Sequence, residues 1–577
     1  MATDRSTAAL VGALVKLRGE LDGASLRLQT PDVEDARVKR VNVVDQLEDY
    51  ILPRLVQLDA PLLTVVGGST GAGKSTLVNT LVGTRVTESG VLRPTTRSPV
   101  LVHNPEDAHW FAPERILPDL ARTNSPSTDI GALRLVAADT VPPGLAILDA
   151  PDVDSVDEAN REMAAQLLAA ADLWLFVTSA ARYADQVPWT FLQAASERST
   201  AVAIVLDRTP PESIAEVRVH LARMLTARGL KDSPLFSVLE GKVDESGLLD
   251  PKAVAPIHDW LYDLAADSEV RAMIISQTLE GAVRQTVFSA HDVADAVAQQ
   301  VQASAQLHQD VENAYALAMS QVQEATADGT LLRGEVLARW QDFVGTGDLI
   351  RSLEERVGRI RDRVVDSLRG KRDKTREVSE AVEQGLYLLL LEHAESAAEA
   401  SVRSWSSVDS GRVLLESGGA GLDRASRDFR VRAERAVRDW QSAVLDLVRN
   451  EGADKRMTAR FLAFGVNGVG VALMVVVFSQ TAGLTGSEAG IGGGTALVGQ
   501  KLLEAIFGDQ AVRRLAQQAH RDLIQRTQGL FDSEKERYLT LLASADAAPD
   551  AADNIRDAAR ACEDARHTDL TPDDWDE

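Results

Sequence analysis

Residues 68–76 are Gly68-Ser69-Thr70-Gly71-Ala72-Gly73-Lys74-Ser75-Thr76, a complete G-x-x-x-x-G-K-[ST] motif. Glycines in this pattern let successive backbone N–H groups point inward at the phosphates of a nucleotide. The apolar run 62–66 before the motif predicts a strand, and residues 76–82 predict a helix whose N-terminal dipole faces the anion. We therefore expect residues 68–76 to bind a nucleoside triphosphate, with Lys74 at the β- and γ-phosphates and the Ser75 hydroxyl on Mg²⁺.

The composition indicates a folded protein with more than one domain. The chain has 577 residues, too many for one hydrophobic core, and 45% of them are apolar and 25% charged. A formal net charge of −25 argues against a nucleic-acid partner, because the phosphates of the nucleic acid would be repelled. The single cysteine, Cys562, excludes an internal disulfide framework, and no secretory signal is apparent, so we expect a cytoplasmic protein.

Hydrophobic periodicity divides the chain into an α/β part and a helical part. Residues 1–60 are predicted to be helical, and residues 61–265 alternate strand-like with helical runs, which is typical of a largely parallel sheet covered by helices. The strand candidates are 62–66, 99–103, 133–137, 144–148, 172–177, 201–206 and 234–239. From about 268 to 460 there is no proline, and residues 266–460 are predicted to form long helices packed as an elongated bundle.

An apolar stretch at residues 461–478 has Asn467 as its sole polar side chain. Eighteen helical residues span about 27 Å, close to the shortest length that crosses the hydrocarbon core of a bilayer. With the weaker apolar run that follows and basic residues on both flanks, we expect 461–507 to form a hairpin that inserts into membrane lipid. Alternatively, 461–478 is the buried centre of a soluble bundle. Returning helices over 508–566 and a disordered acidic tail at 567–577 complete the predicted organisation.

Two further segments are expected to complete the nucleotide site. In Arg93-Pro94-Thr95-Thr96-Arg97 a threonine on a mobile loop would close on Mg²⁺ and the γ-phosphate, and we favour Thr96 because Arg-Ser-Pro and a strand follow it. Asp149 ends an apolar strand, an arrangement that holds Mg²⁺ through water. Asp152 stands where GTPases usually have the glycine of D-x-x-G, so it either turns outward or weakens triphosphate binding.

The strand 201–206 leads into Asp207-Arg208-Thr209-Pro210, a degenerate form of the guanine-binding motif [NT]-K-x-D. Asp207 and Arg208 can substitute for the Asn-Lys pair, with the Arg208 plane stacking on the base. Pro210 occupies the base-reading position and cannot accept hydrogen bonds from guanine there. A preference for GTP over ATP is therefore inferred from the surrounding motifs.

The loop at 67–75, the segment 93–97 and Asp149-Ala150-Pro151-Asp152 resemble those of the dynamin-like GTPases, specifically the bacterial dynamin-like proteins. The order of parts is similar as well: N-terminal helices, GTPase domain, helical trunk, apolar hairpin at its tip and a returning helix. The resemblance implies that the first and last helices form a neck, that the tip inserts into a bilayer, and that Lys74 and Thr96 are catalytic. It also implies GTP as substrate and GDP as product.

The same resemblance implies a homo-oligomer, or a paired dynamin-like partner, that forms through the GTPase domain. It places the chain at the inner face of the cell membrane, where it would remodel the bilayer, with division septa as one setting. Dynamins commonly carry Gln-Ser in the phosphate loop where this chain has Thr70-Gly71, and Val153 rather than a catalytic glutamine follows Asp152. We therefore expect hydrolysis that is slow or dependent on a partner chain.

Other protein classes fit the sequence less completely. A soluble regulatory GTPase is the alternative in which 461–478 is the buried centre of a bundle. The departures from the GTPase motifs also keep open a nucleotide-binding scaffold with little turnover. An ABC-type ATPase is disfavoured, because its L-S-G-G-Q signature is only faintly echoed at 415–419, where Glu416 interrupts it within the helical trunk.

Overall fold

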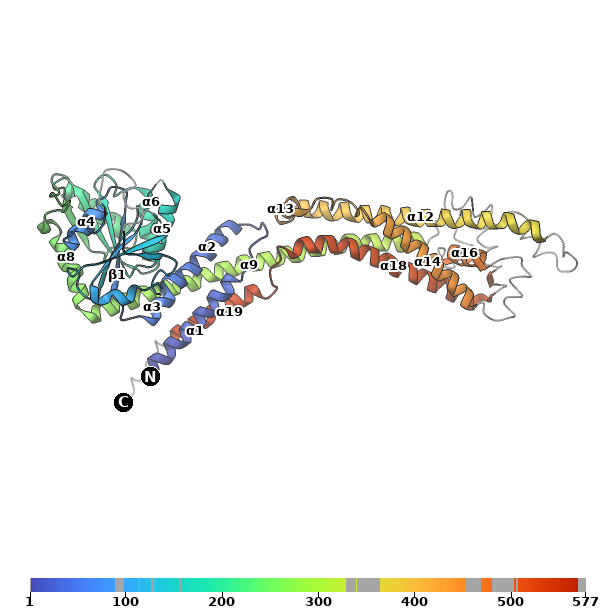
Figure 1. Ribbon diagram of the computed structural model, residues 1–577, viewed down its shortest axis with the longest axis horizontal. Coiled ribbons are helices and arrows are strands. Elements are labelled where there is room, and N and C mark those ends of the chain that lie inside the picture. Colours follow the sequence, from blue (N-terminus) through green and yellow to red (C-terminus); the bar gives the residue numbers. More distant parts are fainter. Residues whose placement is uncertain are drawn as a thin grey trace. The chain divides into compact units, whose positions relative to one another are not determined.

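The computed structural model describes residues 2–88, 98–113, 115–125, 129, 131–155, 157–327, 339, 364–451, 468–479, 503–504 and 507–568 (Figure 1). Its contacts divide the chain into two compact units. The α/β unit comprises Met1–Leu26, Asp32–Ala298 and Ala548–Glu577, and the helical unit comprises Arg27–Pro31 and Gln299–Ala547. Each unit has its own hydrophobic core.

The described part of the α/β unit contains a mixed sheet of eight strands in the order β3-β4-β2-β5-β1-β6-β7-β8. The strands are β1 (Leu62–Gly68), β2 (Val100–His103), β3 (Ala121–Thr123), β4 (Ala132–Ala137), β5 (Leu145–Asp149), β6 (Leu173–Ser179), β7 (Ala201–Thr209) and β8 (Leu235–Leu239). Neighbouring strands are parallel, except that β2 runs antiparallel to β5. The predicted α/β fold is confirmed, and each predicted strand is present. The three-residue β3 was not predicted, because it is too short to show an alternating pattern.

Strand β1 lies inside the sheet and is buried over its whole length. Leu62 and Val66 face one core, and Leu63 and Val65 face the other, as the two-residue period of a strand requires. The first face is covered by α4 (Lys74–Val82) and α8 (Pro251–Ala266). The second is covered by α5 (Glu158–Ala169), α6 (Gln186–Glu197) and α7 (Ile214–Ala227). Figure 1 shows α5 and α6 at the sheet.

Helices from both ends of the chain complete the α/β unit. The N-terminal elements are α1 (Ala2–Asp22), α2 (Val33–Gln46), the π-helix η1 (Leu47–Ile51) and α3 (Leu52–Val56). Figure 1 shows α1 running beside α19 (Ala551–Thr568). Leu14, Leu17 and Leu21, which repeat every three to four residues along α1, share a core with Ile555 and Val293. Val293 belongs to α9 (Ser268–Ala327), the 60-residue helix that follows α8.

A fully buried ion pair joins the N-terminal helices to the sheet. The Arg54 guanidinium of α3 contacts the Asp172 carboxylate through Nη2–Oδ2 at 2.6 Å and Nε–Oδ1 at 3.1 Å. Asp172 also accepts hydrogen bonds from the Tyr50 hydroxyl at 3.0 Å and from the Leu63 backbone N–H at 2.8 Å. Burial raises the pKa of the Asp172 carboxyl, and Arg54 opposes that rise. Because each side chain is 0% exposed, removing one partner leaves the other buried without its counter-charge.

We expect Arg54→Met to lower the free energy of unfolding by about 3–5 kcal/mol, because it leaves an uncompensated buried carboxylate. The half-exposed pair Arg18–Glu48, 3.1 Å apart, supplies the control. Arg18→Met should cost less than about 1 kcal/mol, as exposed ion pairs do. Urea denaturation measures both variants. Equal losses would contradict a structural role for the buried pair, whereas partial recovery in Arg54→Met/Asp172→Asn would support it.

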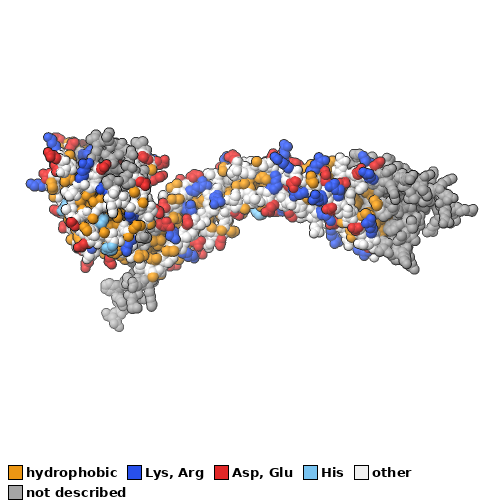
Figure 2. Space-filling view, in the orientation of Figure 1, with side chains coloured by type: hydrophobic (Ala, Val, Ile, Leu, Met, Phe, Trp, Pro, Cys, Tyr) orange, Lys and Arg blue, Asp and Glu red, His pale blue; other side chains and the backbone are white. Residues whose placement is uncertain are grey.

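The described part of the helical unit is a bundle of long helices. It comprises residues 299–327 of α9 with α12 (Val364–Ser406), α13 (Asp409–Gly418), α14 (Phe429–Glu451), α16 (Gly468–Ser479) and α18 (Asp509–Ala543). Two fully buried tryptophans each donate an indole N–H to a neighbouring helix: Trp405 to the Leu307 carbonyl at 2.9 Å and Trp440 to the Ala519 carbonyl at 2.7 Å. On the face shown in Figure 2, basic and acidic side chains are interspersed over these helices.

The apolar segment is partly described, and that part is packed inside protein. Residues 468–479 form α16, and no side chain from 471 to 477 is more than 6% exposed. The helix packs against α12, α14 and α18 within the core of the bundle. No helix among the described residues is long and apolar enough to cross a membrane. This packing is the one expected from the buried-helix alternative. Residues 461–467, 480–502 and 505–506 of the predicted hairpin lie outside the described residues.

The packing of α16 predicts opposite outcomes for two valines on the same helix. Val475 is 1% exposed and Val469 is 48% exposed. Without lipid, Val475→Asp should lower the free energy of unfolding by at least about 3 kcal/mol, because it buries a charge with no partner. Val469→Asp should change it by less than about 1 kcal/mol. Circular dichroism melts compare the two, and equal stability would show that α16 is not a core helix.

Candidate nucleotide-binding site

The loop between β1 and α4 has a backbone that only glycine permits at two positions. Gly68 has φ 143°, and a Cβ there would lie 1.9 Å from the Val177 carbonyl oxygen of β6. Gly73, the N-cap of α4, has φ 102°, and a Cβ there would lie 2.1 Å from Asp207 Oδ2. These distances are far shorter than any van der Waals contact, so the two glycines allow the loop to lie against β6 and β7.

Lys74 turns back over this loop and is almost completely buried. Its ammonium group donates to the carbonyl oxygens of Gly68 at 3.1 Å and Ser69 at 3.2 Å, and to the carboxylate of Asp152. Its side chain is 6% exposed and that of Asp152 is 20% exposed. Of the two orientations that the sequence left open for Asp152, the structure has the inward one.

Asp149, at the end of β5, gathers two hydroxyl groups on one carboxylate oxygen. Ser75 Oγ and Thr87 Oγ1 each donate to Asp149 Oδ2 at 2.7 Å. Burial raises the pKa of the Asp149 carboxyl, and the hydrogen bonds from Ser75 and Thr87 oppose the rise. The other oxygen, Oδ1, is buried without a hydrogen-bond partner among the described residues. A carboxylate with a spare oxygen beside a hydroxyl is an all-oxygen donor set, which fits Mg²⁺.

Thr87 is a member of this cluster that sequence analysis missed. The buried Asn79 of α4 fixes it, since Asn79 Oδ1 accepts from the backbone N–H groups of Val86 at 2.8 Å and Thr87 at 2.9 Å. Asn79 Nδ2 also donates to the Thr87 carbonyl at 2.9 Å. The available signal was a polar residue among the apolar residues of the predicted helix 76–82, which needs a buried partner.

Asp154 also contacts the phosphate loop and was likewise not predicted. Its Oδ1 accepts from both the backbone N–H and the hydroxyl of Thr70, each at 2.6 Å. Its Oδ2 pairs with Arg182 Nη1 at 3.0 Å, and Arg182 also reaches Asp185 at 3.3 Å. Asp152 and Asp154 thus both approach the loop from the segment between β5 and α5.

The Asp207-Arg208 pair lies against the phosphate loop as well. Asp207 Oδ1 accepts from the Arg208 backbone N–H at 2.7 Å, and Arg208 has a left-handed backbone with φ 48°. Burial raises the pKa of the Asp207 carboxyl to about 6. The Arg208 Nε atom lies 3.5 Å from the position a Cβ would take on Gly73. This places both residues beside the phosphate loop.

The structure therefore brings together most of the predicted site residues. Those assembled around the loop are Gly68, Ser69, Thr70, Gly71, Ala72, Gly73, Lys74, Ser75, Thr76, Asp149, Asp207 and Arg208. Thr95 and Thr96 lie outside the described residues. Their assignment to Mg²⁺ and to catalysis stays a prediction.

Comparison with known families identifies this domain. Residues 64–208, which run from within β1 to Arg208, match the model of the dynamin family. Over these residues the α/β domain is similar to the dynamin family. The phosphate loop, Asp149 and the Asp207-Arg208 pair all fall within the matched residues.

Solved structures similar to the whole chain are also dynamins, at low identity. One belongs to an oligomerised bacterial dynamin pair described as providing a mechanism for long-range sensing and tethering of membranes. It is 10% identical, covers 96% of this chain and 95% of its own, and has a TM-score of 0.41. A second structure described in the same way is 10% identical over 93% and 96%, with a TM-score of 0.40. LeoA, a bacterial dynamin GTPase from ETEC, is 14% identical over 94% and 97%, with a TM-score of 0.23. No curated protein matches the chain.

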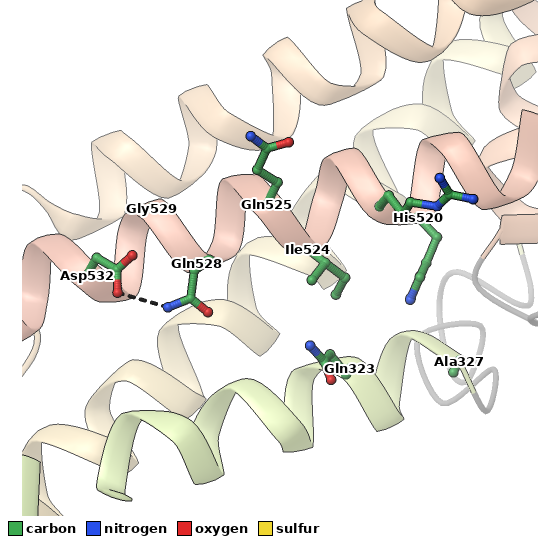
Figure 3. A pocket seen from close by; sticks show the side chains of 9 residues that line it. Gln323, Ala327, His520, Ile524, Gln525, Gln528, Gly529 and Asp532 are labelled. Atoms are coloured by element: carbon green, nitrogen blue, oxygen red, sulfur yellow. Dashed lines mark hydrogen bonds between the residues drawn. The ribbon is translucent and has the colours of Figure 1, made fainter. Parts of the chain in front are cut away.

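A groove in the helical unit is a different kind of surface from the nucleotide site. It has a volume of about 800 Å³ and lies between the end of α9 and α18. Figure 3 shows His520 and Ile524 of α18 directed toward Gln323 and Ala327 of α9. Its lining residues lie on helices, so it presents no loop of inward-pointing backbone N–H groups to phosphate.

The buried Asp207 predicts a pH dependence of stability. Its pKa is about 6 in the folded chain against the ordinary 3.8, so the folded state binds this proton more tightly than the unfolded state does. Its contribution to stability is therefore full below about pH 4 and is lost as the pH rises through about 6, by about 3 kcal/mol. Asp207→Asn lacks this titration. Its free energy of unfolding, measured by urea denaturation, should therefore rise relative to that of the parent as the pH increases from 4.5 to 7.5. The control Asp232→Asn changes an exposed residue and should show no such relative rise. If the difference in free energy of unfolding between Asp207→Asn and the parent does not change with pH, the effect of burial on Asp207 is contradicted.

Proposed function

We propose that this chain is a dynamin-like GTPase that binds GTP with Mg²⁺ and hydrolyses it to GDP. The observation that carries the proposal is the phosphate loop itself. Its glycines adopt positive φ values, Lys74 folds back over it, and Ser75 meets the strand-end Asp149. The dynamin-family match over residues 64–208 supports GTP rather than ATP as the nucleotide.

Each group in the site has a part in this chemistry. Backbone N–H groups of residues 70–75 and the Lys74 ammonium would bind the phosphates, because they are donors at the N-terminus of α4. Ser75 and Asp149 would hold Mg²⁺, which when bound neutralises charge developing on the phosphates. Arg208 would stack on the base with Asp207 beside it. Thr96 would close the site over the γ-phosphate.

Turnover by a single chain should be slow in this proposal. Val153 follows Asp152 where other GTPases have a glutamine, and Thr70-Gly71 replace the Gln-Ser of dynamins. A second copy of this chain, or a paired dynamin-like chain, would complete the site through the GTPase domain. Nucleotide-dependent dimerisation is therefore part of the proposal.

The proposal also includes membrane binding through residues 461–507, at the inner face of the cell membrane. The support is the charge-free apolar run with basic residues on both sides. Because residues 471–477 are buried in the helical bundle, membrane contact through them requires α16 to leave that core. In this view residues 1–60 and 508–566 form the neck and the returning trunk, with residues 266–460 as the trunk.

A second candidate function is a nucleotide-binding scaffold with little turnover. One observation favours it: Asp152, in the place of the usual glycine, already occupies the Lys74 ammonium. A soluble regulatory GTPase is supported in turn by the burial of α16.

The first experiment is a titration of the purified chain with a fluorescent GTP derivative and Mg²⁺. Lys74→Ala should weaken binding about 30-fold or more, because it removes a buried charge-assisted partner of the phosphates. Lys231→Ala, a change at an exposed lysine, should leave it unaltered. Unlabelled GTP should displace the probe and ATP should not. Equal binding by Lys74→Ala and the parent would refute the site, and displacement by ATP alone would refute the preference for GTP.

Phosphate release, measured with and without liposomes, then separates the enzyme from the scaffold. The GTPase predicts release that rises with protein concentration or liposomes and is absent in Lys74→Ala. Tight GTP binding with no release under any of these conditions would identify the scaffold.

A further inference from the structure

We propose that Asp152 and Asp154 are internal competitors of the nucleotide phosphates and set the affinity of the phosphate loop. The inference rests on the proposed nucleotide binding and adds two residues that set its affinity. Both carboxylates belong to the short segment between β5 and α5, which ends at the Asp157 N-cap.

Asp149, the last residue of β5, and the two carboxylates of this segment contact three different parts of the loop. Asp149 accepts from the Ser75 hydroxyl, Asp152 from the Lys74 ammonium, and Asp154 from the backbone N–H of Thr70. The Asp149 contact fits a metal site, in which carboxylate and hydroxyl act together. The other two contacts use the donors that such loops present to phosphate oxygens, an ammonium and an inward-pointing backbone N–H.

The donors cannot serve a carboxylate and a phosphate at once. A lysine ammonium has three hydrogens, and Lys74 directs them to Gly68 O, Ser69 O and Asp152 Oδ1. The N–H and the hydroxyl of Thr70 both point to one oxygen of Asp154. A phosphate that takes these donors must displace Asp152 and Asp154, and it would also be repelled by their charge while they stay.

Burial makes the competition matter energetically. Lys74 is 6% exposed and Asp154 is 9% exposed, so water cannot easily replace either partner. Arg182 strengthens the arrangement, because its guanidinium pairs with the second oxygen of Asp154 at 3.0 Å. Phosphate binding therefore replaces one set of charge-assisted bonds with another, and the net affinity is lower than an open loop would give.

The test removes each charge with little change of shape. Asp152→Asn and Asp154→Asn should each tighten binding of fluorescent GTP and GDP by about tenfold, the equivalent of one charge-assisted hydrogen bond. The control is Asp157→Asn, in the same segment. It removes the same charge, and asparagine caps a helix as well as aspartate does, so affinity should be unchanged. Inorganic pyrophosphate, used as a competitor, should gain affinity in the same two variants, because the competition is for phosphate and not for the base.

A second variant and a second readout keep the proposal decidable. If Asp152→Asn does not fold, Asp152→Gly takes its place in the test. It restores the usual D-x-x-G pattern and should also tighten nucleotide binding. Without nucleotide, Asp152→Asn should have a lower melting temperature than the parent. Saturating GTP should reduce the difference between the two melting temperatures. Unchanged or weaker binding in Asp152→Asn, Asp154→Asn and Asp152→Gly, with a parent that binds GTP, would overturn the proposal. A parent that binds neither GTP nor pyrophosphate would instead overturn the proposed function.

Discussion

A buried ammonium needs oxygen partners, and the candidate nucleotide site is organised around that requirement at Lys74. Two partners come from the loop's own carbonyl groups, which the glycine backbone turns toward the ammonium. The third is the carboxylate of Asp152, where GTPases usually have the glycine of D-x-x-G. Carboxylates of the same chain therefore bind the donors of the phosphate loop. In the proposal, the phosphates of a nucleotide must bind these donors more strongly than the carboxylates do.

Strand β1 connects this site to the rest of the α/β unit. At one end it leads into the phosphate loop, and near its other end the Leu63 backbone N–H bonds to Asp172, the partner of Arg54. A second connection runs through α5, which follows the Asp152–Asp154 segment. The last turn of α5 bonds to the N-terminal helices, through Gln166 to Asp49 at 2.7 Å and through the Ala169 carbonyl to Gln46 at 3.0 Å. The segment that holds Asp152 and Asp154 is thus linked through α5 to α2 and η1.

The sequence was most informative where chemistry restricts the residue type. The conformation of the phosphate loop at Gly68 and Gly73 could be predicted, because only glycine tolerates the positive φ values and close contacts found there. The central strands could be predicted because they are continuous apolar runs. The contacts of Thr87 and Asp154 depend on loops whose paths no periodicity encodes, so sequence analysis missed both. For α16 composition alone could not decide, because a helix apolar on all sides suits a bundle core as well as lipid. In the structure residues 471–477 are buried among α12, α14 and α18.

The most direct test of the central claim is the structure of the chain bound to a non-hydrolysable GTP analogue and Mg²⁺. The distances to follow are those from Lys74 Nζ to Asp152 Oδ1 and from the Thr70 backbone N to Asp154 Oδ1. The account predicts that phosphate oxygens take both donors and that both carboxylates move beyond hydrogen-bonding distance. Nucleotide bound in the loop with Lys74 still on Asp152 and Thr70 still on Asp154 would contradict it.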